Sequence, residues 1–311
     1  MMQPLLMRLH QHQPAAEIHV LAPAWSAPLL RRMPEVANVI ENPFPHGAFD
    51  WAGRKALGGR LAGVDFSAAY VLPNSWKSAL APWFAGIPVR IGFTGEARFG
   101  LLNRRFAKSS RPRLVDRYAA LAGDFPDPTP EPCLISTPEQ QVAARAALGL
   151  PAEARVMIFC PGAEYGPAKR WPIHHFAELA EKVDAGGTAV WILGSTKDAG
   201  VGDEIVRLSG NKALNLCGTT TLEQAIDLIA SAHAVVTNDS GLMHVAAALD
   251  RPLVALYGSS SPGYTPPLSA RATILSLKLE CSPCFKRECP LGHLHCLEHI
   301  TPQQVLAALP L

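Results

Sequence analysis

The sequence predicts an α/β fold made of two Rossmann-like domains, each with a doubly wound parallel sheet. Three observations predict it. Strand-like and helix-like segments alternate in both halves of the chain, as in parallel sheets covered by helices. A proline-rich stretch separates the halves, and 311 residues is the length of about two domains. We expect domains over residues 1–123 and 153–311, with a linker region over residues 124–152.

In the N-terminal half, predicted helices and strands alternate, and the first predicted element is a helix. Pro4 suits a first helical turn, and Leu5, Leu6 and Leu9 form an apolar stripe at helical spacing. Domains of this class usually begin with a strand, so this start is unexpected. Strand patterns follow at residues 18–22 and 68–72, and helical patterns at residues 27–33 and 75–85.

The C-terminal half alternates more regularly and predicts a second doubly wound unit. The carboxyl ends of its strands should meet at one sheet edge, which is where such folds bind ligands. Strand patterns cover residues 156–160, 189–193, 213–216, 234–237 and 253–257, and helical patterns cover 172–184, 222–232, a segment from 242, and 301–311.

Composition and charge exclude several classes of protein. Hydrophobic residues make up 48% and charged residues 17%, so most of the chain is expected to fold around a core. The formal net charge of +2 gives no support to nucleic-acid binding. No apolar run reaches the length of about 18 residues that a membrane-spanning helix needs, and the N-terminus lacks a signal-peptide pattern. We expect a cytoplasmic protein without a nucleic-acid partner.

The strongest local signal is the motif TNDSGLMH at residues 237–244, where a strand pattern ends and a helix begins. Backbone N–H groups at this helix start, with Ser240 and Gly241, can bind an anion. His244 projects from the same helical face, and Asp239 can accept hydrogen bonds from sugar hydroxyls. The alternative is that Asp239 or Ser240 only caps the helix, and the two roles are compatible.

A second signal is CPGAEYGPAKRWP at residues 160–172, where Gly162 follows a strand and Lys169 precedes a helix. A lysine in such a loop can neutralise a diphosphate leaving group as its charge grows in the transition state. The alternative is that Lys169 and Arg170 are a surface pair.

Two more loops, at residues 194–198 and 217–221, follow the next strands and carry Ser195, Thr219 and Thr220. Together the four loops predict a nucleotide pocket. Neither the GxGxxG fingerprint nor the P-loop pattern is present, which disfavours a dehydrogenase or a P-loop kinase.

Four of the seven cysteines lie within residues 281–296, in the pattern C-x2-C-x4-C-x6-C. Without a secretion signal, a disulfide scaffold is not expected. The cysteines either bind a structural zinc or other metal, or are reduced or partly oxidised structural residues; a catalytic role is not expected. They are Cys281, Cys284, Cys289 and Cys296.

A basic stretch before the linker contains a single acid, Asp116. It is either a solvated surface or a landing site for an anionic ligand. Its basic residues are Arg104, Arg105, Lys108, Arg111, Arg113 and Arg117.

Several long segments resemble the glycosyltransferase family 9 heptosyltransferases, in particular the heptosyltransferase II branch. They are TNDSGLMHVAAALDRPLVALYGSSSP, CPGAEYGPAKRWP, YVLPNSWKSALAPWFAGIPVRIGF, VLAPAWSAPLLRRMPEV and CSPCFKRECPLGHLHC. The resemblance implies a GT-B fold, two Rossmann-like domains with the active site between them. It also implies transfer of L-glycero-D-manno-heptose from ADP-heptose, with inversion, to the first heptose of the lipopolysaccharide inner core.

The resemblance further implies roles for individual residues. Lys169 corresponds to the lysine that steadies the departing ADP, and Asp239 to the aspartate that holds the heptose. The donor diphosphate loop contains Ser240, Gly241 and His244, while Thr219 and Thr220 lie near the adenosine. No cofactor is required beyond the donor substrate.

For the acceptor, the resemblance implies a heptosylated Kdo-lipid A, which is acidic and phosphorylated. Because this acceptor is a lipid, peripheral contact with the cytoplasmic face of the inner membrane is also implied. The residues expected to bind the acceptor are Asn74, Ser75, Lys77, Arg104 and Arg105.

The chain departs from the family pattern at its start. Family members begin with a strand and a Gly-Asp loop whose aspartate is the general base, a role that contributes about 10² to 10⁴ in rate. Here the sequence starts where the family's first helix starts. We expect that the start site is assigned too late. The alternatives are a catalytically silent nucleotide-sugar-binding protein, or another GT-B enzyme that uses a different nucleotide sugar.

Overall fold

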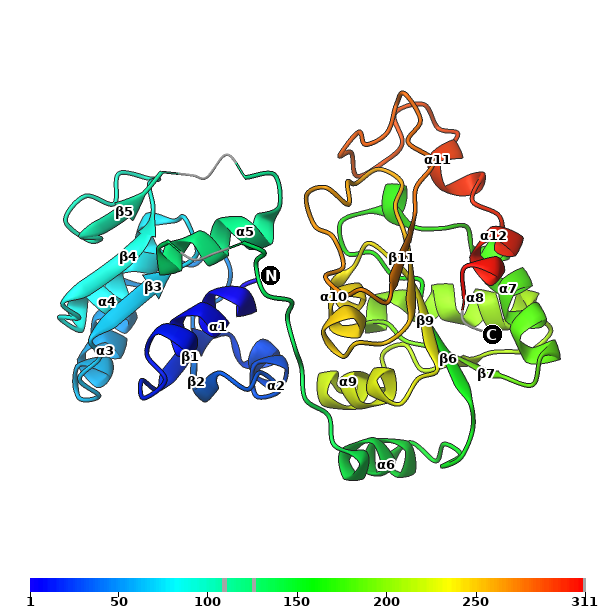
Figure 1. Ribbon diagram of the computed structural model, residues 1–311, viewed down its shortest axis with the longest axis horizontal. Helices are drawn as coiled ribbons and strands as arrows, with labels where there is room; N and C mark the ends of the chain where they lie inside the picture. The colour runs from blue at the N-terminus through cyan, green and yellow to red at the C-terminus, as the bar shows by residue number, and fades with distance from the viewer. Residues whose placement is uncertain (108–110, 125–126, 310–311) are drawn as a thin grey trace. The chain divides into compact units, whose positions relative to one another are not determined.

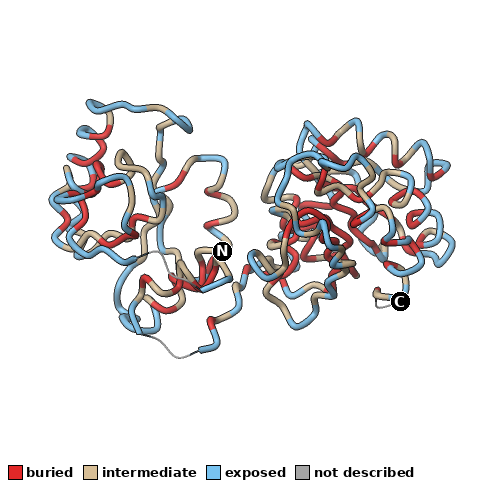
Figure 2. Tube along the Cα trace, turned by 90° about the horizontal axis from the view of Figure 1, so that it is seen from above, coloured by how far each residue is buried: buried red, intermediate tan, exposed pale blue. Residues whose placement is uncertain are grey.

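The computed structural model describes residues 1–107, 111–124 and 127–309. It divides into two compact units: Met1–Ala27 with Glu35–Pro130, and Pro28–Pro34 with Glu131–Leu311. In both units every pair of neighbouring strands is parallel, and helices connect most of the consecutive strands (Figure 1). Buried residues concentrate inside each unit (Figure 2). The predicted α/β class with parallel sheets is confirmed.

Two separate parallel sheets form the first unit. No strand within the described residues of this unit joins them, so the single predicted sheet is divided. One sheet pairs β1 with β2, and the other has the order β3-β4-β5. The strands are β1 (Ile18–Ala22), β2 (Val36–Glu41), β3 (Ala68–Val71), β4 (Val89–Phe93) and β5 (Arg104–Phe106).

Prolines explain why two predicted helices of this unit are shorter than expected. Pro34 disfavours helical geometry at Met33, and the helix predicted over residues 27–33 ends at Leu30. Pro82 has no N–H to donate to the turn before it, so the helix predicted over residues 75–85 is divided into a 3-10 turn and α4. The helices are α1 (Gln3–His12), α2 (Ala27–Leu30), α3 (Trp51–Ala62), α4 (Leu80–Phe84) and α5 (Leu114–Ala119), with 3-10 turns at Ala24–Ser26, Trp76–Ala79 and Ala120–Ala122.

The second unit contains one six-stranded parallel sheet in the order β11-β10-β9-β6-β7-β8. Counted from its first strand, this is the 3-2-1-4-5-6 order of the Rossmann fold. Both central strands are completely buried, which explains why β6 is apolar throughout and β9 is apolar up to Val236. The strands are β6 (Val156–Cys160), β7 (Ala189–Ile192), β8 (Leu214–Asn215), β9 (Ala234–Asn238), β10 (Leu253–Leu256) and β11 (Ala272–Leu275).

The four helices predicted in the second unit, α7, α9, α10 and α12, start close to the predicted positions, whereas α6, α8 and α11 were not predicted. Three helices of this unit, α6, α9 and α12, have capping boxes that the sequence encodes. The helices are α6 (Pro138–Ala147), α7 (Ile173–Ala185), α8 (Ala199–Leu208), α9 (Leu222–Ala230), α10 (Gly241–Ala248), α11 (His295–Glu298) and α12 (Pro302–Ala307), with 3-10 turns at Pro167–Lys169 and Thr196–Asp198.

The range predicted as a linker, residues 124–152, contains a helix of the second unit. α6 packs against α9, and its buried Arg145 donates hydrogen bonds to Ser231. The chain joins this unit at Glu131, and Leu134 N–H already donates to the Ala248 carbonyl at 2.8 Å. Within the range, residues 125–126 lie outside the described residues.

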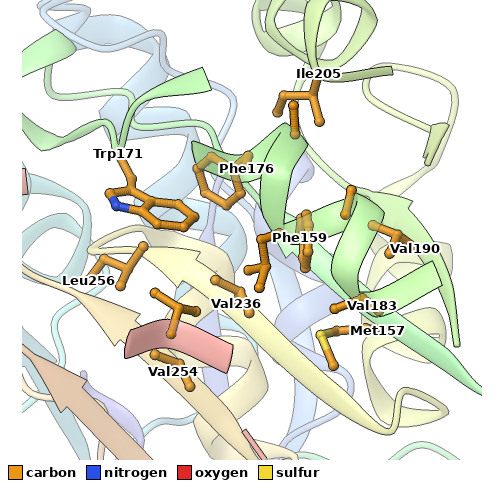
Figure 3. Close-up of a cluster of buried hydrophobic side chains, with 14 of the residues drawn as sticks. Met157, Phe159, Trp171, Phe176, Val183, Val190, Ile205, Val236, Val254 and Leu256 are labelled. Atoms are coloured by element: carbon orange, nitrogen blue, oxygen red, sulfur yellow. The ribbon is translucent and has the colours of Figure 1, made fainter. Parts of the chain in front are cut away.

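Trp171 anchors the core of the second unit. Its side chain is 1% exposed and packs beside Phe176 (Figure 3), and its Nε1–H donates to the Ile300 carbonyl at 2.8 Å. The indole therefore links the end of the β6 loop to the C-terminal segment.

Replacement of Trp171 by alanine is expected to lower the free energy of unfolding by about 3–5 kcal/mol, because it leaves a large cavity and an unpaired carbonyl. Denaturant unfolding measures this change. Val142→Ala on α6, 59% exposed, is the control and should change stability by less than about 0.5 kcal/mol. Equal effects of the two substitutions would contradict the assignment of Trp171 to the core.

Candidate functional site

Strand order in the second unit places a ligand site at the carboxyl ends of β6 and β9. These strands are neighbours in the sheet, but the chain moves away from them in opposite directions, to β7 and to β10. Such a topological switch point leaves a crevice between the two departing loops, where doubly wound folds bind ligands. The loops that leave these two strands contain Lys169 and Asp239.

Lys169 and Asp239 meet across this switch point. The distance from Lys169 Nζ to Asp239 Oδ2 is 2.5 Å, and the side chains are 18% and 5% exposed. The ammonium also lies 5.2 Å from the centre of the Tyr165 ring. Two charged residues 70 positions apart thus form a pair that is largely shielded from water.

Asn238 fixes the two loops to each other, a role that the sequence analysis did not assign. Its buried Oδ1 accepts the Trp171 N–H at 3.0 Å, and its Nδ2 donates to the Pro161 carbonyl at 2.7 Å. The sequence feature that could have identified Asn238 was its position at the end of a buried strand, directly before Asp239. The amide holds the loop that carries Lys169 against the strand end that carries Asp239.

The start of α10 has the features of an anion site. Ser240 is the N-cap residue, but its side chain makes no capping hydrogen bond; its hydroxyl lies 3.3 Å from Thr237 Oγ1. Asp239 pairs with Lys169 instead of serving only as a cap. A Cβ added to the exposed Gly241 would meet nothing within 4 Å, so a ligand can approach the backbone there. His244, half-buried, follows on the same helix.

Ser195 and Gly162 lie in neighbouring loops around Asp198. The Asp198 carboxylate accepts hydrogen bonds from the Ser195 N–H and hydroxyl, at 2.9 and 2.7 Å. A Cβ on Gly162 would lie 2.6 Å from the same carboxylate, so only glycine fits there. The Ser195 hydroxyl therefore stabilises the conformation of the loop at residues 194–198 through its hydrogen bond to Asp198.

The fourth loop exposes Thr219, whose hydroxyl donates to the Leu216 carbonyl at 3.0 Å. Thr220 beside it is half-buried. Gly218 before them has φ of 75°, a left-handed conformation that favours glycine.

Two buried cysteines near these loops are not candidate nucleophiles. Burial raises the pKa of Cys160 strongly and that of Cys217 to about 12. Both thiols therefore stay protonated at neutral pH, and only a thiolate is a good nucleophile.

In the first unit, Arg105 on β5 lines a cavity of about 570 Å³. Its guanidinium lies over the Phe99 ring, 4.4 Å from the ring centre. Arg104 is exposed on the same strand but is not among the lining residues. Lys108 lies outside the described residues. The cavity is lined by Thr94, Gly95, Glu96, Ala97, Arg98, Phe99, Asn103 and Arg105.

The loop with Asn74, Ser75 and Lys77 is hydrogen-bonded to two residues that line this cavity. The buried Arg98 donates to the Pro73 carbonyl at 2.7 Å, and Glu96 accepts the Trp76 N–H at 2.7 Å. Asn74 is exposed, and Ser75 and Lys77 are half-buried. Asn74, Ser75 and Lys77 thus lie on a loop that is hydrogen-bonded to residues of the cavity that Arg105 lines.

Three side chains with potential metal-ligand atoms cluster on the surface of the second unit. Ligand atoms of His174, His175 and Glu298 all lie within 4.8 Å of one another, and this is the single group of its kind in the described part of the chain. His174 Nε2 is 3.5 Å from Glu298 Oε1. These residues lie on α7 and α11, and none of them was selected from the sequence.

Comparison with known proteins identifies the family. A family model described as glycosyltransferase family 9 (heptosyltransferase) matches residues 54–295, which is more than half of the chain. The chain belongs to this family. The chain is 47% identical to lipopolysaccharide heptosyltransferase 2 of Escherichia coli (strain K12) over 324 residues, covering 99% of this chain and 93% of that protein.

Further relatives agree with this assignment. Lipooligosaccharide heptosyltransferase 2 of Haemophilus influenzae (strain Rd) is 46% identical, covering 98% of this chain and 93% of that protein. The solved structure of Escherichia coli ADP-heptose lipopolysaccharide heptosyltransferase II matches with a TM-score of 0.87 and 44% identity, covering 98% of this chain and 92% of that one. The predicted GT-B class, characteristic of this family, is confirmed. In the described residues, no helix of the heptosyltransferase is long and apolar enough to cross a membrane.

Proposed function

We propose that this heptosyltransferase transfers L-glycero-D-manno-heptose from ADP-heptose, with inversion, to the first heptose of the lipopolysaccharide inner core. The observation that carries the proposal is the Lys169–Asp239 pair at the switch point of a Rossmann-like sheet. The similarity to relatives named heptosyltransferase 2 supports the choice of donor and acceptor.

On the donor side, positively charged and N–H groups act on the diphosphate, and a carboxylate acts on the sugar. The Lys169 ammonium pairs with Asp239, which directly precedes the N-cap of α10. The ammonium and the N–H groups at the start of this helix stabilise the negative charge that grows on the departing diphosphate. Asp239 keeps a second carboxylate oxygen for the hydroxyls of the heptose. The loops with Gly162, Ser195, Thr219 and Thr220 supply the rest of the donor pocket. The reaction needs no cofactor beyond ADP-heptose.

On the acceptor side, the first unit supplies positive charge for a phosphorylated, heptosylated Kdo-lipid A. Arg105 lines the cavity, and Arg104 beside it is exposed. Asn74, Ser75 and Lys77 lie on the loop attached to that cavity. Arginine suits this role because its planar fork binds phosphate through two hydrogen bonds.

We also place the protein in the cytoplasm, in peripheral contact with the cytoplasmic face of the inner membrane. In the first unit, Phe49 and Trp51 are 57% and 45% exposed and lie 5.9 and 6.3 Å from the Trp76 ring, between ring centres. Such amphipathic aromatic groups favour the membrane interface. Sedimentation with vesicles of anionic phospholipid tests this contact: Trp51→Ala should weaken it, and vesicle binding unchanged from wild type would contradict it.

A donor panel tests the proposed reaction. The purified chain is incubated with heptosylated Kdo-lipid A and either ADP-heptose or a UDP-sugar, and the mass of the acceptor is followed. We expect the acceptor to gain one heptose from ADP-heptose alone. Turnover of a UDP-sugar alone would assign a different donor, and binding of ADP-heptose without transfer would identify a silent nucleotide-sugar-binding protein.

Replacement of Arg105 by alanine is expected to raise the KM for the acceptor about tenfold or more, since a charge-assisted hydrogen bond contributes about 1.5–3 kcal/mol. The KM for ADP-heptose should stay unchanged. Steady-state kinetics with each substrate varied measures both constants. Arg60→Ala, at an exposed position on α3, is the matched control. A rise in the KM for ADP-heptose alone would contradict the acceptor role.

A further inference from the structure

Three side chains of the second unit come together where the start of α7 faces α11. Ligand atoms of His174, His175 and Glu298 all lie within 4.8 Å of one another. His174 Nε2 is 3.5 Å from Glu298 Oε1, and the rings of the two histidines are 4.3 Å apart between centres. Two atoms bound to one tetrahedral zinc ion lie about 3.3–3.6 Å apart. One pair of this group therefore already has the spacing of zinc ligands.

The cysteine segment of residues 281–296 does not form such a group. Cys281, Cys284, Cys289 and Cys296 are free of disulfides. In the part of the chain that the structure describes, they are not among the side chains whose ligand atoms come within 4.8 Å of one another. The geometry of a metal site is therefore found at the histidines and the glutamate, which the sequence analysis did not select, and not at the C-x2-C pattern.

The backbone fixes the positions of all three ligands. Both histidines directly precede Phe176 on α7, and the glutamate directly follows Leu297 on α11; Phe176 and Leu297 are both 0% exposed. The Trp171 Nε1–H donates to the Ile300 carbonyl at 2.8 Å, which connects the residue pairs that flank the two helices. Since the elements that carry the ligands are packed into the core, metal binding has to order only side chains.

His175 has a ring nitrogen without a partner. Its Nδ1 is buried and makes no hydrogen bond within the described residues, and the ring packs beside Trp171 with 5.2 Å between ring centres. A buried polar atom that lacks a partner destabilises a fold. Coordination of a cation by the ring supplies a partner that the protein itself does not.

We propose that His174, His175 and Glu298 bind one zinc ion, which cross-links α7 to α11. Two imidazoles and one carboxylate are a set that zinc uses in tetrahedral sites, with a water molecule in the fourth position. Magnesium and calcium prefer oxygen ligands, so the two histidines disfavour them. The His174 and Glu298 side chains are 59% and 40% exposed, and a shift of about 1 Å brings all three ligand atoms to zinc-binding spacing.

The cross-link secures a segment that contacts the loop of Lys169. α7 begins directly after this loop, and α11 ends the long segment that follows β11 (Figure 1). Within that segment, the Arg287 carbonyl accepts the Ala168 N–H at 3.0 Å, and the Phe285 carbonyl accepts the Tyr165 hydroxyl at 2.7 Å. A ligand that binds only the folded chain stabilises it by mass action, so zinc should raise the unfolding temperature.

Zinc titration of the full chain tests the site. The protein is stripped with EDTA, dialysed in the presence of a reductant, and titrated with zinc chloride. We expect zinc at a hundredfold excess over its Kd to raise the Tm by about 5 °C or more, and magnesium chloride to leave it unchanged. In equilibrium dialysis, His174→Ala and Glu298→Gln should each bind about one zinc equivalent fewer than the wild type.

Matched variants keep the test specific. Glu181→Gln removes a charge from an exposed position further along α7, and His10→Ala removes an exposed histidine from α1; both should respond to zinc like the wild type. In EDTA, His174→Ala should unfold at the wild-type temperature, because His174 is exposed. A lost zinc response in this variant therefore reports lost binding and not a damaged fold.

A wild-type chain that zinc does not stabilise would overturn the proposal, as would wild-type zinc binding in His174→Ala. Zinc that is lost in Cys284→Ser but kept in His174→Ala would belong to the cysteine segment. Loss confined to His299→Ala would assign the metal to the stacked rings of His295 and His299, which lie 4.4 Å apart between centres, and would equally overturn the proposal. Because none of these measurements involves heptose transfer, their outcome is independent of the proposed function.

Discussion

Replacement of Lys169 by alanine is expected to lower the rate of heptose transfer by about 10²–10³. In the proposed mechanism, the ammonium stabilises the charge that develops on departing ADP, and loss of one such contact costs this much in comparable sites. Steady-state kinetics at saturating ADP-heptose measures the effect, which should appear in kcat.

The control for this prediction is Lys197→Ala. Lys197 belongs to a loop at the same sheet edge, but its side chain is 73% exposed and pairs with the exposed Glu164. Its replacement should leave the rate unchanged. Because Lys169→Ala leaves Asp239 buried without its cation, thermal unfolding must show that the variant is folded at the assay temperature. A folded Lys169→Ala variant with wild-type kcat would show that Lys169 takes no part in catalysis.

Replacement of Asp239 by asparagine is the second substitution with a large expected effect. Asparagine keeps the size of the side chain but removes the charge that holds Lys169 Nζ at 2.5 Å. In the proposed mechanism it also weakens the hydrogen bonds that residue 239 accepts from the sugar. We expect kcat to fall by about 10²-fold or more. The same kinetic assay, with ADP-heptose as the varied substrate, measures it.

Asp250→Asn is the matched control for Asp239→Asn. Asp250 is exposed and follows the other end of α10, so this change removes the same charge without touching the site. Its kcat and both KM values should equal those of the wild type. If Asp239→Asn raised only the KM for the acceptor, the residue would not hold the donor sugar.

In the second unit, much of the fold could be predicted because its central strands are buried on both faces. The sequence of β6 is a continuous apolar run and β9 begins with one, Ala234–Val236, and polar residues follow these runs closely. The sequence therefore located the loops of Lys169 and Asp239. It did not show that these strands are neighbours, because strand order depends on packing between distant segments. The role of Asn238 depends on that same adjacency.

In the first unit, the periodic signal was weaker for physical reasons. All three residues of β5 are exposed, so no apolar pattern marks the strand. β2 contains no buried residue, so an alternation of apolar and polar residues is equally hard to recognise there. α6 lay inside the predicted linker, although its capping box at Thr137 and Gln140 is a helix signal that the sequence contained.

The most direct test of the central claim is a double-mutant cycle on the Lys169–Asp239 pair. Transfer from ADP-heptose is measured for the wild type, for Lys169→Ala, for Asp239→Ala and for the double variant. If the two residues act as one unit on the donor, the double variant should lose little more than the more impaired single variant. Losses that simply add, or near-wild-type transfer in either folded single variant, would contradict the account.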